Sequence, residues 1–402
     1  MGPPYFTKEK FLIIDVVKIL QFWKIIKIWK AVAKILLIKI LKESENKMRR
    51  RKFLGIGLAM LLALGLILTG CGGNSTEQSS GSAPAEEKEK PIEITFAHFD
   101  PADSALDIHI AQKFANELSA ATNGKVKLVI YPSGTLVPID KILDGVLSGA
   151  CDIGFFPTAW AVGRLPYTFM FEQAGIGFNS GKAASLAFDE AMRTFAADEY
   201  KDVHPLCFFC SGPGIIITKE KINSLNDIRG MQIRSNATNA EAIKAWGGTP
   251  VTMNTSEVYE ALRQGIIDGF LGVADPVASL KFYEVTNYVT KNDMFNSGYV
   301  ICMNKDKYNS LPADIQKAID DVSQKLWKES FINYYDTRHA EAMKVITSKA
   351  TEYEIPADVY QQMVDKASVL VDKYAAELDS NGLKGTEEAK LLRELVNKYN
   401  NQ

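Results

Sequence analysis

Two cysteines three residues apart are the first side chains whose spacing suggests chemistry. Cys207 and Cys210 enclose two phenylalanines, and a Cys-x-x-Cys pair is typical of zinc sites and of redox-active dithiols. The pair lies in an apolar run of strand character, where residues three apart point to opposite faces. No second pair follows to complete a zinc site. We therefore expect both cysteines to be buried hydrophobic residues, and we expect no metal site.

Patterns typical of catalysis are not found in the sequence. There is no Gly-x-Ser-x-Gly, no His-Glu-x-x-His and no phosphate-binding Gly-x-x-x-x-Gly-Lys motif. The four histidines are scattered without the spacing of metal ligands: His98, His109, His204 and His339. We expect a protein that is not an enzyme and has no cofactor. An extracytoplasmic hydrolase is the alternative from another functional class.

Cys71 ends a segment with the pattern of a secretory signal peptide. Met48–Lys52 is basic, Phe53–Ile67 is an uncharged apolar run, and Leu68–Cys71 reads Leu-Thr-Gly-Cys. These four residues resemble the bacterial lipobox, which implies cleavage before Cys71 and attachment of lipid to this residue. An uncleaved membrane helix is the alternative, but the run is short for a span. We assign residues 48–70 to a lipoprotein signal peptide and expect a lipid-anchored protein outside the cytoplasm, in the periplasm or at the outer face of the cytoplasmic membrane.

The segments that flank this signal peptide are not expected to belong to the fold. Residues 1–47 mix lysines with Ile, Leu and Trp, a pattern that a basic amphipathic helix on a membrane would also show. Because a signal peptide should begin a protein, we interpret them as upstream sequence translated in error, with initiation at Met48. Residues 71–91 are rich in Gly, Ser, Glu and Lys, and we expect a flexible, lipid-anchored linker there.

The composition of the chain is that of a globular protein with room for two cores. Of the 402 residues, 47% are hydrophobic and 23% are charged, and this length allows two lobes. The formal net charge of −2 creates no field that would attract a polyanion. Nucleic acid is therefore not an expected partner.

Strands and helices alternate beyond the linker, which predicts an α/β fold. Expected strands at 92–98 and 126–131 flank an amphipathic helix at 104–121, and this order indicates parallel pairing with a crossover helix. A helix at 138–147 and a strand at 151–156 follow. A second unit has expected strands at 231–234 and 267–273 and helices at 239–246 and 256–264, the last capped by Ser256.

Two crossings and a long helix join the two units. Leu206–Thr218 is extended and is interrupted by Ser211–Gly214, which suits a bend between lobes, and the chain returns near Phe295–Met303. Residues 312–378 are mostly helical and are broken near 354–356. Their apolar stripe predicts a spine helix that packs against both lobes through Ala313, Ile315, Ile319, Val322, Leu326, Phe331 and Tyr335. We assign lobe I to residues 92–211 plus 298–337, and lobe II to residues 212–297 plus 338–402.

Ligands of open α/β sheets bind beyond the carboxyl ends of strands, which selects the residues of candidate cleft loops. On the first lobe these are Phe99, Asp100, Pro157, Thr158 and Trp160.

Several motifs in register resemble the solute-binding proteins of tripartite ATP-independent periplasmic (TRAP) transporters, the DctP-type family. The matching segments are Tyr131–Leu136, Gly149–Gly154, Leu225–Arg234, Ser256–Leu262, Gly265–Gly269, Lys281–Val285 and Tyr308–Pro312. The resemblance extends from about Ile92 to the C-terminus. It implies a two-lobed, type II-like periplasmic-binding-protein fold with a hinge, which closes around a carboxylate and docks on a two-part membrane permease.

Arg234 is the residue to which the resemblance assigns the ligand carboxylate. It ends the Gly-x-x-Ile-Arg strand that is the family's signature. A guanidinium presents a planar pair of donors that matches a carboxylate edge to edge. Without the surrounding motif, Arg234 would be interpreted as a strand-end arginine in a surface salt bridge.

The sequence departs from the family at polar positions near the ligand. Gly214 stands where several acid-binding members carry a second arginine, and Gly272 stands where many carry an asparagine. Thr255 replaces a frequent aromatic residue, and Pro157 replaces an acidic one. With Trp160 and two phenylalanines nearby, Phe99 and Phe155, these changes predict a monocarboxylate ligand with an apolar or aromatic body.

Further candidate ligand contacts come from neighbouring loops. Asn236 lies two residues beyond Arg234, on the same side of an extended chain, and Arg164 and Asn296 are also within expected reach. We expect a monomeric receptor whose partners are a small carboxylate, the membrane through the lipid anchor, and the TRAP permease. A receptor that feeds a sensor kinase is the alternative.

Overall fold

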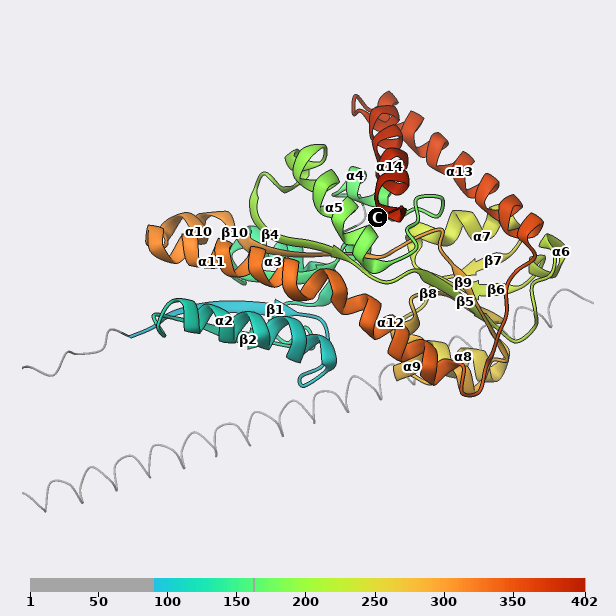
Figure 1. The fold of residues 1–402 in the computed structure, drawn as a ribbon, viewed down its shortest axis with the longest axis horizontal. Helices are drawn as coiled ribbons and strands as arrows, with labels where there is room; N and C mark the ends of the chain where they lie inside the picture. Colours follow the sequence, from blue (N-terminus) through green and yellow to red (C-terminus); the bar gives the residue numbers. More distant parts are fainter. Residues whose placement is uncertain (1–89, 162, 402) are drawn as a thin grey trace, which may run out of the picture. The chain divides into compact units, whose positions relative to one another are not determined.

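The computed structural model describes residues 90–161 and 163–401, which form two β-sheets with helices packed around them (Figure 1). The predicted signal peptide at 48–70, the predicted lipid site Cys71, residues 1–47 and nearly all of the linker lie outside the described residues. In the described part of the chain, no helix combines the length and the apolar character needed to cross a membrane.

The first sheet has the strand order β2-β1-β3-β10-β4. Its strands are β1 (Ile92–His98), β2 (Val126–Tyr131), β3 (Ile153–Pro157), β4 (Val203–Cys210) and β10 (Gly298–Asn304). β1 pairs in parallel with β2 and β3, whereas β10 is antiparallel to β3 and β4. A π-helix at Asp107–Gln112 continues as α2 (Lys113–Ala121) between β1 and β2. The predicted parallel pairing with a crossover helix is confirmed.

The second sheet has the strand order β11-β9-β5-β8-β6-β7. Its strands are β5 (Gly214–Thr218), β6 (Gln232–Arg234), β7 (Thr249–Val251), β8 (Gly269–Gly272), β9 (Tyr288–Asn292) and β11 (Thr351–Glu352). β6 is parallel to β7 and β8, and β5 is antiparallel to β8 and β9. The second predicted α/β unit is therefore present.

Helices pack on both sheets. Besides α2 and the long C-terminal ones they are α3 (Ile142–Ser148), α4 (Pro166–Phe171), α5 (Gly181–Thr194), α6 (Leu225–Ile228), α7 (Ala240–Trp246), α8 (Val258–Gln264), α9 (Ala274–Ser279) and α10 (Lys305–Ser310). The cap predicted at Ser256 is wrong, because the Asn254 side chain accepts from the Glu257 amide while the Glu257 carboxylate accepts from the Asn254 amide at 3.1 Å. This capping box starts a 3-10 turn at Thr255–Glu257 that leads into α8.

The predicted spine helix runs continuously from Ala313 to Ile346. It consists of α11 (Ala313–Leu326), a π-helical segment at Trp327–Phe331, and α12 (Ile332–Ile346). α11 contacts α2 and β4, whereas α12 contacts α5 and also α9 beside the second sheet. The expected stripe is buried except at Ala313, which is exposed because it occupies the first turn. One helix thus packs against both lobes, as Figure 1 shows in orange.

The hinge between the sheets consists of two crossing segments that are joined by hydrogen bonds. The Ser211 amide donates to the Ser297 carbonyl at 2.8 Å, and the Ser297 amide donates to the Ser211 hydroxyl oxygen at 2.9 Å. The Asn296 side chain is fully buried there. It donates to the Ser211 carbonyl at 3.1 Å and accepts from the Phe178 amide at 2.8 Å. Asn296 therefore holds the crossing segments to the α4–α5 connection.

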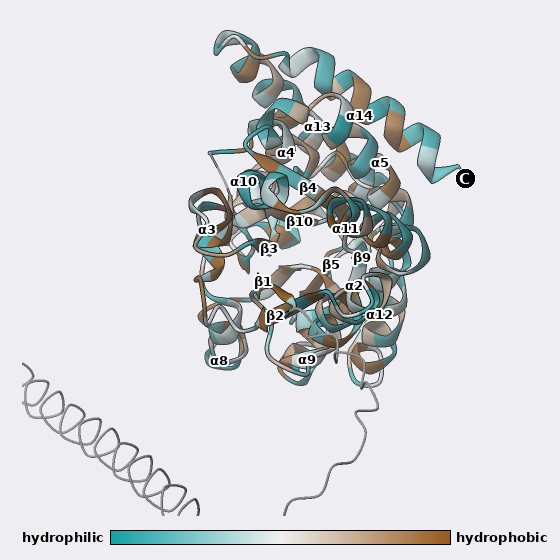
Figure 2. Ribbon diagram, turned by 90° about the vertical axis from the view of Figure 1, so that its left-hand side faces the viewer, coloured by the Kyte–Doolittle hydropathy of each residue, from teal (hydrophilic) through white to brown (hydrophobic). Residues whose placement is uncertain are grey.

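We keep the predicted lobe boundaries as a proposal, except that the C-terminal helices do not belong to lobe II alone. The strands of the first sheet fall within 92–211 and 298–337, and those of the second within 212–297 and 338–402. However, α14 (Gly385–Asn400) packs on α5 of lobe I, and α13 (Ala357–Ser380) contacts both α7 and α4. Hydrophilic and hydrophobic residues alternate along these two helices (Figure 2), since each buries one face. They form a second connection between the lobes.

Cys207 and Cys210 are both fully buried and free. Cys207 packs with Phe209 in the core on one face of the first sheet, and Cys210 packs with Phe208 in the core on the other face. Burial raises the pKa of each thiol. The prediction that both are small buried hydrophobic residues is confirmed.

A carboxyl group without a hydrogen-bond partner in the structure makes the packing of α14 dependent on pH. Glu388 is fully buried, and both of its carboxyl oxygens are unpartnered. Burial, followed by the nearby charge of Glu199, raises its pKa from 4.5 to about 10. The folded chain therefore keeps a proton that the unfolded chain loses above pH 4.5, so stability falls as the pH rises through this range.

We expect Glu388→Leu to raise the free energy of unfolding at pH 8 by about 1 to 3 kcal/mol, because it removes an unsatisfied buried polar group. The variant should also lose the decline of stability with pH. Denaturant unfolding of both proteins at several pH values checks this, and a variant less stable than the wild type at pH 8 contradicts it.

Candidate functional site

A cavity of about 700 Å³ lies between the two sheets and gathers residues from both lobes and the hinge. The lining from lobe I and the hinge comprises Pro157, Ala159, Trp160, Ser297 and Tyr299. The lining from lobe II comprises Arg234, Ser235, Asn236, Ala237, Thr252, Met253, Asn254, Thr255, Glu257, Phe270, Leu271, Gly272, Val273 and Pro276. Most of these residues lie at or beyond the carboxyl ends of β3, β6, β7 and β8, as expected for an α/β sheet.

Arg234 is half-buried at the end of β6, and backbone and side-chain acceptors fix its guanidinium. Its Nε and Nη2 donate to the Met253 carbonyl at 3.3 and 3.1 Å, and Nη2 also donates to the Thr255 hydroxyl at 3.1 Å. These bonds occupy the Nε–Nη2 side of the fork. The protein therefore orients the group without neutralising its charge.

The charge of Arg234 has no protein counterion in the described part of the chain. The arginine ion pairs found there belong to Arg164, Arg193, Arg263, Arg338 and Arg393. Burial lowers the pKa of Arg234, but arginine remains charged at neutral pH. A partly desolvated cation that faces a cavity is a site for an anion.

Two residues of β8 form the floor beneath this cation. The Phe270 ring lies 5.2 Å from the Arg234 guanidinium carbon, and Arg234 and Phe270 are directly paired in neighbouring parallel strands. A Cβ at Gly272 would lie 2.3 Å from Cζ of Phe270. The Phe270 ring therefore extends over Gly272, and this part of the floor is apolar.

Aromatic residues form the wall on the side of lobe I. Trp160 is 46% exposed at the cavity, whereas Tyr299 is only 8% exposed. Tyr299 stacks on Tyr335 of the spine helix with ring centroids 4.7 Å apart, and on Phe99 at 6.4 Å. The wall therefore consists of the exposed Trp160 indole and the buried Tyr299 ring, which packs against the spine helix.

Asn236 supplies the cavity with a polar group beside Arg234. Its Oδ1 accepts from the Thr238 hydroxyl at 2.8 Å and from the side-chain Nδ2 of Asn239 at 3.1 Å. The NH₂ group has no acceptor among the described residues, so it is available as a donor. The site thus combines a cation and an amide donor with aromatic and aliphatic walls.

Five of the ten residues predicted to contact ligand line this one cavity: Arg234, Asn236, Trp160, Pro157 and Gly272. Their contact with ligand stays a prediction. Two others lie directly behind the lining. Phe99 packs against Tyr299, and Thr158 is buried, with its hydroxyl bonded to the Glu172 carboxyl and to the Gly298 carbonyl.

Three predicted residues are not brought to the cavity lining. Asn296 is buried in the hinge, where its amide bonds to backbone groups. A Cβ at Gly214 would lie 2.3 Å from the Phe295 ring, so an aromatic ring fills the space that a side chain at 214 would need. Arg164 forms an ion pair with Asp144 on the surface of lobe I.

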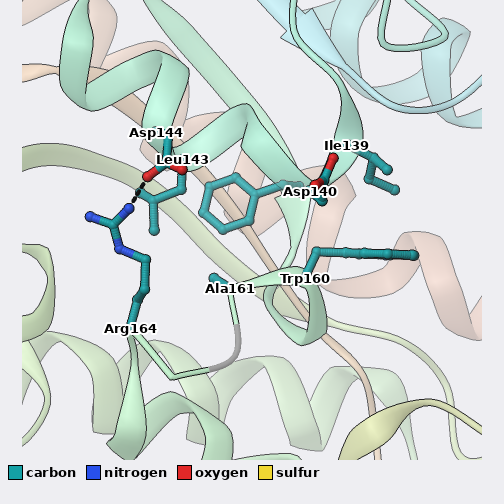
Figure 3. Close-up of a pocket in the computed structure, with 8 residues that line it drawn as sticks. Ile139, Asp140, Leu143, Asp144, Trp160, Ala161 and Arg164 are labelled. Carbon is teal, nitrogen blue, oxygen red and sulfur yellow. Dashed lines mark ion pairs between the residues drawn. The ribbon is translucent and has the colours of Figure 1, made fainter.

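Figure 3 shows Arg164 directed toward Asp144, with Trp160 on the other side of a small pocket. This pocket has a volume of about 20 Å³, little more than one water molecule needs. It is lined by residues of α3 and the turn before it, and by residues of β3 and the loop after it. It is too small for an organic ligand, and Trp160 lines both this pocket and the larger cavity.

Sequence reasoning missed Tyr299, Phe270 and Met253. Phe270 and Tyr299 are apolar residues of expected strands, and their face could be assigned only after the strand register was known. Met253 acts through its backbone carbonyl, for which the side-chain sequence holds no signal.

Comparison with known proteins matches most of this chain to one family. The model of the bacterial extracellular solute-binding protein family 7, DctP, matches residues 96–378. The C4-dicarboxylate-binding periplasmic protein DctP of Rhodobacter capsulatus is 27% identical over 242 residues, which is 58% of this chain and 70% of that protein.

Solved structures resemble the chain over most of its length. A TRAP solute-binding protein from a marine metagenome, specific for aromatic acid ligands and in complex with metahydroxyphenylacetate, is 28% identical with a TM-score of 0.71. The comparison covers 77% of this chain and 99% of that one. A TRAP solute-binding protein of Rhodoferax ferrireducens with copurified benzoate is 26% identical with a TM-score of 0.69, over 77% of this chain and 98% of that one.

Gly272→Ala tests the apolar floor. The added methyl group collides with the Phe270 ring. We therefore expect the free energy of unfolding of the variant to be about 1 to 3 kcal/mol lower than that of the wild type. It should also bind a carboxylate ligand more weakly, because the displaced ring no longer supports Arg234. In the double variant Phe270→Leu/Gly272→Ala the colliding ring atom is gone, and stability should return toward that of Phe270→Leu alone. Denaturant unfolding of the three variants measures this, and a Gly272→Ala protein as stable as the wild type contradicts the collision.

Proposed function

The chain belongs to the bacterial extracellular solute-binding protein family 7, and from that premise we propose that it is a TRAP-transporter receptor that captures an aromatic monocarboxylate. The observation that carries this proposal is the Arg234 guanidinium, oriented by the Met253 carbonyl and facing a cavity with aromatic walls. The carboxylate binds Arg234, and the ring of the ligand lies between the walls of the two lobes.

The charges around the cavity support one carboxylate per ligand. Among the described residues that line it, Arg234 is the only Lys, Arg or His, and Glu257 is the only acid. A dicarboxylate would bury its second anionic group without a cation, which costs several kcal/mol unless hydrogen bonds replace the lost water. This argues for a different specificity from that of the C4-dicarboxylate-binding relative.

The walls support an aromatic body for the ligand. Trp160, Tyr299 and Phe270 offer ring faces and edges, and Leu271, Val273 and Pro276 add aliphatic surface. Ring pairs contribute about 0.5 to 1.5 kcal/mol beyond their buried area. Two similar solved proteins carry metahydroxyphenylacetate and benzoate, which are aromatic monocarboxylates of the kind that this lining fits.

Binding closes the lobes because the ligand touches both of them. Arg234 lies on the second sheet, whereas Trp160 follows a strand of the first. A ligand shifts the open–closed equilibrium only by its difference in affinity for the two states. Contacts to Trp160 that tighten on closure supply that difference, and the closed receptor is the form that the permease recognises.

The cellular setting is part of the same proposal. The chain acts outside the cytoplasm as a monomer anchored by lipid at Cys71, and it delivers its ligand to the TRAP permease subunits. The three similar proteins named above are binding proteins. We propose that the chain likewise binds its ligand without chemical conversion.

A ligand series tests the proposed specificity. We expect benzoate and 3-hydroxybenzoate to bind at least about tenfold more tightly than succinate, since only the dicarboxylate leaves a second charge unpaired. Isothermal titration calorimetry at pH 7 measures the three values. Succinate as the tightest ligand would show that the cavity accommodates a second anion.

Arg234→Ala tests the anchor itself. Loss of the guanidinium should weaken benzoate binding by about 2 to 4 kcal/mol, and Arg234→Lys should lie between the variant and the wild type because an ammonium keeps the charge without the planar fork. Arg164→Ala is the matched control, since this arginine pairs with Asp144 on the surface and should leave affinity unchanged. If Arg234→Ala and Arg164→Ala lowered the affinity for benzoate equally, Arg234 would not be the carboxylate anchor.

A further inference from the structure

A buried carboxyl group lies directly behind the wall of the cavity that lobe I supplies. Glu172 follows α4 and is 1% exposed. Its Oε1 is in hydrogen-bond contact with the Thr158 hydroxyl, and it accepts from the Gly298 amide at 2.6 Å. The Thr158 hydroxyl is also 3.0 Å from the Gly298 carbonyl oxygen. Glu172, Thr158 and Gly298 therefore form a closed ring of three hydrogen-bond contacts.

The ring has three contacts but only two protons from Thr158 and Gly298. The hydroxyl of Thr158 carries one hydrogen, and the amide of Gly298 carries one. When Glu172 is ionised, Oε1 takes both hydrogens, and the Gly298 carbonyl receives none from Thr158. When Glu172 is protonated, it donates to Thr158, the hydroxyl donates to the carbonyl, and the Gly298 amide donates to Glu172. Only the protonated carboxyl satisfies all three contacts.

This ring joins the two segments that form the wall of lobe I. Backbone pairing of β3 with β10 reaches Pro157 and Tyr299. Beyond it, Thr158 begins the turn that carries Trp160, and Gly298 connects Ser297 to Tyr299. The ring therefore continues the link between these strands where their backbone pairing ends.

The surroundings of Glu172 favour its neutral form. Burial is the main cause that raises its pKa from 4.5 to about 7, against hydrogen bonds from Thr158 and Gly298 that lower it. In the described residues, the titratable groups that sense its charge are Tyr200 from the turn before β4, Cys210 from β4, and Tyr299 from β10. Burial raises the pKa of each of these groups, so they are neutral at pH 7 and supply no counterion.

We propose that Glu172 is a positioning residue that holds the Trp160 turn against the Tyr299 strand only while its carboxyl carries a proton, so that ligand affinity falls as the pH rises. This inference rests on the proposed function, because it concerns the wall of the same cavity. Glu172 itself does not line the cavity and acts through Trp160 and Tyr299.

The direction of the effect follows from the proton count. Only molecules in which Glu172 carries its proton bind ligand tightly. The fraction of such molecules decreases above the pKa of Glu172, by up to tenfold per pH unit. We expect the Kd of the full-length protein for benzoate to rise by about 5- to 30-fold between pH 6 and pH 8.5. Benzoate is fully ionised throughout this range, so its own titration does not contribute.

Glu172→Gln provides the direct test by calorimetry at both pH values. An amide cannot titrate, so we expect its Kd for benzoate to change by less than about twofold. Glu388→Gln is the matched control, because it alters a buried carboxyl in α14 that lies outside the cavity lining, and it should keep the pH dependence of the wild type. A Glu172→Gln protein with the pH dependence of the wild type overturns the proposal, as does a wild-type Kd that is flat with pH.

Infrared spectroscopy of the ligand-free wild type gives a second test that needs no ligand and no variant. A protonated-carboxyl band that disappears between pH 6 and pH 8 supports the proposal. A spectrum in which Glu388 is the only carboxyl group still protonated at pH 6, and in which its band persists beyond pH 8, overturns the proposal. If Glu172→Gln does not fold, Thr158→Val breaks the same ring and should likewise remove the pH dependence. Failure of every acid to bind at any pH refutes the proposed function, whereas tight binding without pH dependence refutes only the role of Glu172.

Discussion

The uncompensated positive charge of Arg234 is the constraint on which the rest of the site depends. A half-buried guanidinium without a carboxylate partner in the described residues is stable only if other groups satisfy its hydrogens, and the Met253 carbonyl and the Thr255 hydroxyl do so on one side of the fork. The ring of Phe270 supports it from β8. Arg234 also lines the cavity, and we propose that the remaining side of the fork binds an anion there.

The fold makes this charge useful by placing it on one lobe and the aromatic wall on the other. Two crossing segments, the spine helix and the C-terminal helices α13 and α14 connect the two sheets. Crossing segments of this kind absorb a hinge rotation in small backbone changes, whereas packed helices keep the lobes in register. The spine also holds Tyr299 through its stacking on Tyr335, so the wall of the cavity and the connection between lobes share one aromatic contact.

Two buried carboxyl groups, Glu388 and Glu172, have different pKa values because their surroundings differ. Glu388 has no hydrogen-bond partner in the structure, and its pKa rises to about 10, so it stays neutral and only reduces stability as the pH rises. Glu172 bonds to Thr158 and Gly298, which keeps its pKa at about 7. A group with this pKa changes its charge near neutral pH, where a change in the wall of the cavity affects binding.

The sequence predicted most strands and helices of the two α/β units, the spine helix, the burial of Cys207 and Cys210, and the motif around Arg234, because these features follow from local periodicity and contiguous residues. It contained no clear signal for α4, α5 or α14. It could not decide which candidates share a cavity. Trp160, Arg234 and Tyr299 come from segments far apart in the chain, and only sheet register and packing bring them together. The same holds for Gly214 and Gly272, whose missing side chains are replaced by the rings of Phe295 and Phe270. Only the tertiary structure shows which side chain fills the space beside each glycine, because a close-packed interior leaves few voids and residues distant in sequence can fill them.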